Sequence, residues 1–275
     1  MAEGTPPERY ELLLFSTERD FVLEAVEAGV DGIIVDWELD GKLRRQAQAD
    51  TEINHDTVDD LRRVRSWVDI PVTCRINPPG KQTERELEAA IDAGADEVFV
   101  PMVRSPDELA RIIDMAGERC GVGALIETTA AVACACELAK LPVSRFYVGL
   151  NDLAIERRSS SIFDAIADGT VERVRSAVPG PFGFAGLTAP EGGHPIPCRL
   201  LISELVRLNS TFSFLRRSYR RDARGQDQAA LISRIRSALA AARNRTPAEV
   251  GHNTRELAEA IAAWSAERST PLAHA

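Results

Sequence analysis

The sequence predicts a (β/α)8 TIM barrel followed by one extra C-terminal helix. Eight strand-like apolar runs recur along the 275 residues, and a stretch long enough for a helix separates each run from the next. The runs are apolar almost throughout instead of alternating, a pattern typical of parallel strands covered on both faces. Eight strand–helix units in succession favour a closed barrel over an open doubly wound sheet.

The expected strands follow one another at fairly regular intervals. They are residues 10–16, 32–37, 71–77, 97–103, 121–127, 145–151, 182–188 and 211–217. The helices expected between them are amphipathic, and several end on glycine, as helix C-termini often do. Two stretches, "AGVDGIIVD" at 28–36 and "AGADEVFVP" at 93–101, place a helix end, a tight turn and a strand in the same order. This internal echo is consistent with repeated units.

The open-sheet alternative lacks its sequence signals. "GVGALI" at 121–126 offers two glycines of a dinucleotide-binding fingerprint and no third, and no Walker A glycine–lysine loop occurs. The length of the chain fits one barrel, because α/β barrels of this size are commonly single domains. We therefore favour the barrel.

A further helix is expected beyond the barrel. Thr246–Pro247 is a helix start signal, and Leu257, Ile261 and Trp264 lie on one face of the helix that follows. We divide the chain into a catalytic barrel domain, 1–245, and a helical extension, 246–275. A contact in a homo-oligomer is the expected cover for this apolar face. The alternative is that the helix folds back on its own barrel.

Composition restricts the partners and the location of the protein. The net charge is −9 and the pI about 5.1, which argues against nucleic acid as the main partner. No apolar run reaches the length of a membrane span and no secretory leader pattern opens the sequence, so we expect a cytoplasmic protein without a membrane partner. The five cysteines form no CxxC pair, and we expect reduced, mostly buried thiols.

Polar residues gather at the ends of the expected strands, where the active site of a TIM barrel lies. Carboxylates dominate these positions, around a single arginine. The residues are Asp36, Glu38, Asp40, Arg75, Asn77, Glu127, Asn151, Asp152, Thr188, Glu191 and His194. Crowded carboxylates repel one another unless a cation lies between them.

Glu127 and Asp152 fall on neighbouring strands, one strand–helix repeat apart. Two hard oxygen ligands with room for water and a bidentate substrate suit Mg²⁺ or Mn²⁺ and are poor for zinc. The alternative is that each carboxylate caps the helix that follows it, where the helix dipole favours a negative charge.

Five segments in order resemble the HpcH/HpaI aldolase and citrate lyase β-subunit family, which belongs to the phosphoenolpyruvate/pyruvate superfamily of TIM barrels. The segments are "DGIIVDWE", "CRIN", "AGADEVFVPMV", "ALIETTAAV" and "YVGLNDLA". The resemblance covers about residues 10–220. It implies that Glu127 and Asp152 bind a divalent metal whose shell is completed by water and an α-oxo acid.

The resemblance also implies roles for residues beside the metal. Arg75 would face the oxygen of a bound pyruvate or its enolate, and Glu38 would order the waters of the metal. Asn151 and Thr188, at the ends of two strands, are further candidates for substrate binding. The alternative for Arg75 is a structural ion pair.

The sequence departs from the family pattern after the strand 2 glutamate. HpcH-type aldolases carry an acid–base histidine at the next position, where this chain has Leu39. The lyase β-like branch commonly has aspartate there, and here Asp40 comes one residue later. His55 and His194 are the candidates for supplying acid–base chemistry from elsewhere, although a solvated or helix-capping histidine is the alternative for each.

Two arginine-rich stretches, 156–161 and 216–221, are expected at the same mouth. One interpretation is that these arginines are simply solvated at the surface. The other is that they bind a second carboxylate, a phosphate or the tail of coenzyme A. The sequence thus predicts a divalent-metal-dependent carbon–carbon lyase or aldolase that acts through a pyruvate-like or acyl enolate, on a small oxo acid or an acyl-CoA. The alternatives are other enolate chemistry, by a decarboxylase, hydrolase or mutase, and a barrel that only binds.

Overall fold

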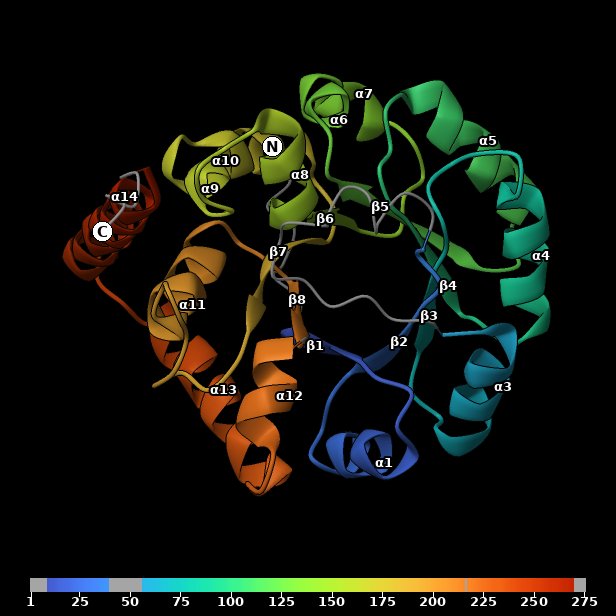
Figure 1. The fold of residues 1–275 in the computed structure, drawn as a ribbon, viewed down its shortest axis with the longest axis horizontal. Coiled ribbons are helices and arrows are strands. Elements are labelled where there is room, and N and C mark those ends of the chain that lie inside the picture. The colour runs from blue at the N-terminus through green and yellow to red at the C-terminus, as the bar shows by residue number, and fades with distance from the viewer. Residues whose placement is uncertain (1–8, 40–55, 216, 270–275) are drawn as a thin grey trace, which may run out of the picture.

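The computed structural model describes residues 9–39, 56–215 and 217–269, and these form a closed barrel of eight parallel strands (Figure 1). Each strand pairs with the next in sequence, and the last pairs with the first. The strands are β1 (Glu11–Phe15), β2 (Gly32–Asp36), β3 (Val72–Arg75), β4 (Glu97–Val100), β5 (Gly121–Ile126), β6 (Phe146–Val148), β7 (Phe182–Leu187) and β8 (Phe212–Leu215). The predicted TIM barrel is confirmed.

Helices surround the barrel in the order of the strands (Figure 1). They are α1 (Arg19–Glu27), α3 (Val58–Trp67), α4 (Thr83–Asp92), α5 (Pro106–Ala116), α6 (Thr129–Ala133), α7 (Ala135–Leu138), α8 (Leu150–Arg157), α9 (Asp164–Ala167), α10 (Thr170–Ala177), α11 (Cys198–Arg207), α12 (Arg217–Ala223), α13 (Gln228–Arg243) and α14 (Pro247–Ser269). The internal echo is real: α1 and α4 are followed by Gly29 and Gly94, whose φ angles of 95° and 92° favour glycine.

Every strand ends one to three residues earlier than the sequence predicts, and the two largest differences, of three residues, each have a local cause. β4 stops at Val100 because Pro101 has no N–H to donate and Met102 adopts a left-handed φ of 54°. β6 stops at Val148 because α8 begins at Leu150, with Gly149 as its N-cap. The second difference turns the predicted strand end 149–151 into the start of a helix.

A cluster of eight buried apolar side chains fills the middle of the barrel, and we call it the central plug. Its members are Leu13, Phe15, Ile34, Phe99, Leu125, Tyr147, Phe212 and Phe214. The rings of Tyr147 and Phe214 stack with centroids 3.8 Å apart. A guanidinium lies over a ring of the plug on either side: Arg75 is 5.2 Å from Phe15, and Arg145 is 5.1 Å from Phe212.

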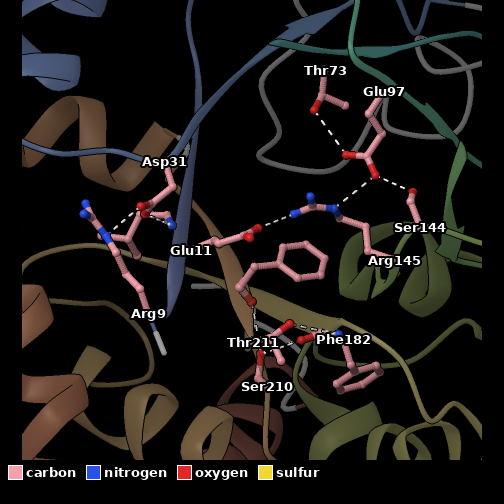
Figure 2. Close-up of polar contacts among 12 residues, drawn as sticks. Arg9, Glu11, Asp31, Thr73, Glu97, Ser144, Arg145, Phe182, Ser210 and Thr211 are labelled. Carbon is pink, nitrogen blue, oxygen red and sulfur yellow. Dashed lines mark hydrogen bonds and ion pairs between the residues drawn. The ribbon is translucent and has the colours of Figure 1, made fainter. Parts of the chain in front are cut away.

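Arg145 belongs to a polar network at the N-terminal end of the strands (Figure 2). Its Nε donates to Glu97 Oε1 at 3.0 Å, and its Nη1 donates to Glu11 Oε2 at 2.5 Å. Glu97 also accepts hydrogen bonds from the hydroxyls of Thr73 and Ser144. This end of the barrel is therefore held by the pairing of Arg145 with two carboxylates, one of which, Glu97, has further donors.

Helix α14 confirms the predicted extra helix and lies beside α11 and α9 at the edge of the barrel (Figure 1). Leu257 and Ile261 are buried there, and the Ser265 hydroxyl donates to Asp164 at 2.9 Å. The apolar face is thus covered by the chain's own barrel, which was the alternative in the sequence analysis. The oligomer contact and the division at residue 245 stay predictions.

The five cysteines are free thiols. Cys74 and Cys198 are buried, Cys120 and Cys134 are half-buried, and Cys136 is exposed. None of the described helices combines the length and apolar character that a membrane crossing requires.

Candidate active site

Arg75 lies at the C-terminal end of β3 and forms a buried ion pair with two carboxylates. Its Nε and Nη2 donate to the two oxygens of Asp36 at 2.8 and 2.6 Å, and its Nη1 lies 3.2 Å from Glu38 Oε2. The register of the sheet places Asp36 directly beside Arg75. All three side chains are at most 3% exposed.

Burial and charge act in opposite directions on Arg75. Burial by itself lowers the pKa of the guanidinium, but the charges of Asp36 and Glu38 outweigh it, so the pKa lies above its usual value. Arg75 therefore stays charged. The structural ion pair that the sequence analysis left as an alternative is present.

Asp36 is itself fixed by its neighbours. Its backbone N–H donates to Asp56 Oδ2 at 3.0 Å, and the Thr17 hydroxyl donates to the other oxygen of Asp56 at 3.1 Å. The Glu38 N–H donates back to Asp36 Oδ1 at 3.2 Å. Asp56 therefore connects the ends of β1 and β2 and sets the strand end from which Asp36 and Glu38 project.

Glu127 follows the last residue of β5 and is 3% exposed. Its Oε2 accepts the Met102 N–H at 3.1 Å, a bond that the left-handed Met102 backbone directs at the carboxylate. Burial and the negative charges of Asp152 and Glu38 together raise the pKa of Glu127 to about 8, against the smaller lowering by Arg75 and the Met102 N–H. A carboxyl that resists ionisation in this way would be stabilised as an anion by a cation.

Asp152 lies in the first turn of α8 and is 5% exposed. It reaches the same end of the barrel as Glu127 because α8 begins immediately after β6. A negatively charged side chain in the first turn of a helix is favoured by the helix dipole. The position of Asp152 is therefore consistent both with stabilising the start of α8 and with binding a metal.

The donor set fits a divalent metal that takes part of its shell from substrate and water. Among residues 9–39, 56–215 and 217–269, no three His, Cys, Asp or Glu side chains are arranged to hold a metal by themselves. Glu127 and Asp152 would supply two carboxylate oxygens, and Mg²⁺ commonly binds through one or two carboxylates. Both side chains are buried, at 3% and 5% exposure, and the negative charge of Asp152 raises the pKa of Glu127, which fits a cation bound between them.

Of the two candidate histidines, only His194 lies among the described residues. His194 is exposed, and its ring packs edge-on against Trp264 of α14 at 5.4 Å. His55 and Asp40 lie outside the described residues. At position 39, the Leu39 N–H donates to Asn77 Oδ1 at 2.8 Å, so its backbone is anchored to the end of β3.

The substrate-binding candidates have contrasting surroundings. Asn151 is half-buried in the first turn of α8, one residue before Asp152. Thr188 is buried at the end of β7, and its hydroxyl donates to Asp222 of α12. Thr188 therefore ties β7 to the helix after β8.

Several arginines of the two basic stretches pair with carboxylates of the chain. Arg157 binds Asp168, and Arg220 binds Glu18 at 2.5 Å. Glu156, in the same stretch as Arg157, accepts the backbone N–H of Thr129 at 2.9 Å. The part of these stretches that the structure describes thus holds neighbouring loops and helices together.

The sequence analysis did not predict three contacts of the site, those made by Asp36, Met102 and Gly149. Asp36 was noted as a strand-end carboxylate, but its pairing with Arg75 follows only from sheet register. Met102 contributes a backbone N–H, for which its residue type gives no signal. Gly149 borders Glu127; a glycine at a helix N-cap, where serine or aspartate is preferred, is the signal that could have found it.

Comparison with known proteins finds relatives by structure but not by sequence. No family model matches the chain, and no curated protein matches it. The HpcH/HpaI aldolase of Desulfitobacterium hafniense DCB-2 is 16% identical with a TM-score of 0.59, over 87% of this chain and 95% of that one. An HpcH/HpaI aldolase/citrate lyase family protein of Burkholderia cenocepacia J2315 is 16% identical with a TM-score of 0.58, over 86% and 95%. The shared property is the fold, and the family that the sequence segments resemble includes these structures.

Proposed function

We propose that this protein is a divalent-metal-dependent carbon–carbon lyase or aldolase that acts on a small 2-oxo acid or a hydroxyacyl-CoA. One observation carries the proposal: Glu127 and Asp152, two buried carboxyl groups on neighbouring strand–helix units, lie at the C-terminal end of the barrel together with the buried ion pair of Arg75 with Asp36 and Glu38. A cation bound between Glu127 and Asp152 would stabilise both in the ionised form. The likeness in fold to aldolase structures supports the same conclusion.

Glu127 and Asp152 would hold Mg²⁺ or Mn²⁺, which when bound supplies a Lewis acid for the charge that develops on a substrate oxygen. Glu38 pairs with Arg75, and its negative charge raises the pKa of Glu127. Glu38 would order water beside the metal. Asn151 would contact substrate from the first turn of α8, and Thr188 from the end of β7.

Arg75 would stabilise the enolate. Breaking a carbon–carbon bond next to a carbonyl leaves negative charge on the carbonyl oxygen, and fixed donors aimed at that oxygen lower the barrier. Nε, Nη1 and Nη2 each have one carboxylate contact. The second hydrogens of Nη1 and Nη2 are the donors we assign to the substrate. The carboxylates thus hold the guanidinium in place without using all its donors.

The leucine at position 39 favours a second candidate function, an enzyme that also forms an enolate but breaks a different bond. The side chain at this position cannot carry a proton, and its backbone is anchored by Asn77. A decarboxylase, hydrolase or mutase that forms an enolate by another route would not need a histidine here. The third candidate is a barrel that binds the metal and an oxo acid without turnover.

The test is isothermal titration with Mg²⁺ and oxalate, a mimic of the pyruvate enolate. Wild type should bind oxalate only with Mg²⁺, and Glu127→Gln should not bind it, because one ligand is lost. Glu11→Gln, which changes a carboxylate at the opposite end of the barrel, is the matched control and should bind oxalate like wild type. Oxalate binding by Glu127→Gln equal to wild type would contradict the proposal.

A substrate panel then separates the candidates. Pyruvate release from hydroxy-oxo acids identifies an aldolase, and acyl-CoA cleavage identifies a lyase of 3-hydroxyacyl-CoA. Release of carbon dioxide together with the substrate one carbon shorter, and no other fragment, identifies a decarboxylase. Oxalate binding without turnover of any member would favour the binding barrel.

A further inference from the structure

Gly149 lies directly against the Glu127 carboxylate. Ile126 and Val148 are partners in the sheet, so Glu127 and Gly149 are the next pair along β5 and β6. The Gly149 N–H donates to Ile126 O at 3.1 Å, which continues the pairing. A Cβ built on Gly149 would lie 2.2 Å from Glu127 Oε1 and 2.4 Å from Glu127 Cγ. The glutamate therefore occupies the space where any other side chain at position 149 would begin.

The backbone does not require a glycine at this position. Gly149 has φ −83° and ψ 94°, which other residues adopt without strain. It is also the N-cap of α8, where serine, threonine, aspartate or asparagine would stabilise the start of the helix. All four carry a Cβ. Glycine is itself tolerated at an N-cap, about as well as threonine, and the contact with Glu127 is what excludes the residues that would cap more strongly.

The Glu127 carboxylate is fixed on two sides. The Met102 N–H binds Oε2 at 3.1 Å, and Gly149 borders Oε1 and Cγ. Asp152, the other candidate ligand, follows Gly149 by three residues on the same helix start. A shift of the chain at Gly149 would consequently move both ligands relative to each other.

We propose that Gly149 is a positioning residue that sets where the Glu127 carboxylate stands relative to Asp152, and that it permits a glutamate at position 127. This inference rests on the metal-binding role in the proposed function. Outer contacts of metal ligands commonly change metal affinity by about 10- to 100-fold.

The experiment compares Gly149→Ala in two backgrounds. Titration with Mn²⁺ alone should show affinity at least about tenfold weaker in Gly149→Ala than in wild type. In the Glu127→Ala background, which removes the Cγ that the methyl group would otherwise meet at 2.4 Å, Gly149→Ala should change affinity by no more than about twofold, because the added methyl group has space. Gly186→Ala is the control, since a Cβ there meets its nearest atom, Phe214 O, at 3.5 Å.

A second readout does not depend on metal. In a ¹H–¹⁵N spectrum of the metal-free protein, the Met102 amide proton should move upfield in Gly149→Ala and stay in place in Gly186→Ala, because the displaced carboxylate no longer accepts its hydrogen bond. An unchanged Met102 amide, or equal loss of Mn²⁺ affinity in both backgrounds, would overturn the inference. If wild type binds no metal, the proposed function fails, and the Met102 amide still decides the role of Gly149.

Discussion

The two ends of the barrel each hold an arginine that pairs with two carboxylates and lies over a phenylalanine of the central plug; Arg75 is buried and Arg145 is half-buried. At the N-terminal end, the partners of Arg145 are Glu97, which has two further hydroxyl donors, and Glu11, whose side chain is 43% exposed. The C-terminal end adds Glu127 and Asp152, both buried. An ion pair is therefore common to both ends, and the two further buried carboxyl groups, Glu127 and Asp152, distinguish the C-terminal end.

The largest expected effect is at the C-terminal end. Arg75→Met should lower the free energy of unfolding by about 3–5 kcal/mol, because Asp36 and Glu38 would be left buried without their cation. Urea denaturation measures the loss. Arg104→Met, which removes an exposed partner of Glu156, is the control and should cost less than about 1 kcal/mol. If Arg75→Met lowered the free energy of unfolding no more than Arg104→Met does, the C-terminal end would not depend on its arginine more than an exposed surface pair does.

The second prediction concerns pH at the C-terminal end. Burial and the charge of Asp152 raise the folded-state pKa of Glu127 from 4.5 to about 8, so the folded protein binds more protons than the unfolded chain between these values. Stability in metal-free buffer should therefore fall as pH rises from about 4.5 to about 8. Glu127→Gln should remove this fall and stabilise the protein at pH 8 by on the order of 2 kcal/mol.

Thermal melts of both proteins across this pH range measure the effect. Glu11→Gln, at the other end of the barrel, should keep the wild-type pH dependence. Added Mg²⁺ should raise the melting temperature of wild type most at high pH, where the carboxylate is ionised. A wild-type curve that rises with pH between 5 and 8 would show that Glu127 is not held in this way.

The third prediction concerns the N-terminal end. Arg145→Met should cost about 1–2 kcal/mol, less than Arg75→Met, because Glu11 can be hydrated and Glu97 retains its hydroxyl donors. Urea denaturation under the same conditions gives both values. Oxalate and Mg²⁺ binding should be unchanged in this variant. An equal or larger loss for Arg145→Met would mean that the two ends are equally dependent on their cations.

The smallest expected effect is at Thr73. Thr73→Val removes one hydrogen bond of 3.3 Å to Glu97, and the loss should be below about 1 kcal/mol because Arg145 and Ser144 still bind that carboxylate. Denaturation of Thr73→Val in the Arg145→Met background sharpens the comparison. The cost should grow there, since Glu97 has lost its main partner.

Most of the fold could be predicted from the sequence. Near-continuous apolar runs, glycines such as Gly29 and Gly94 after helices, and the start signal at Thr246–Pro247 are local features, and each one directly indicates a strand, a helix end or a helix start. What covers α14 could not be predicted, because its apolar face would suit a partner subunit or the chain's own α11 equally well.

The site could be predicted in part. Strand-end positions identified the buried carboxylates and Arg75, since parallel strands bring these ends together. The contacts among them depend on register and on backbone conformation, as the pairing of Arg75 with Asp36 and the left-handed turn at Met102 show. His194 illustrates the limit: its loop suggested the mouth, yet its ring packs against Trp264 of the added helix.

The central plug has a consequence for proton traffic. Its eight side chains close the axis of the barrel with apolar atoms, so a chain of water molecules has no route from one end to the other. Under the proposed function, any proton that an enolate gains or loses beside Arg75 would therefore be exchanged at the C-terminal end of the barrel. The central plug would then form an apolar floor beneath the reacting atoms.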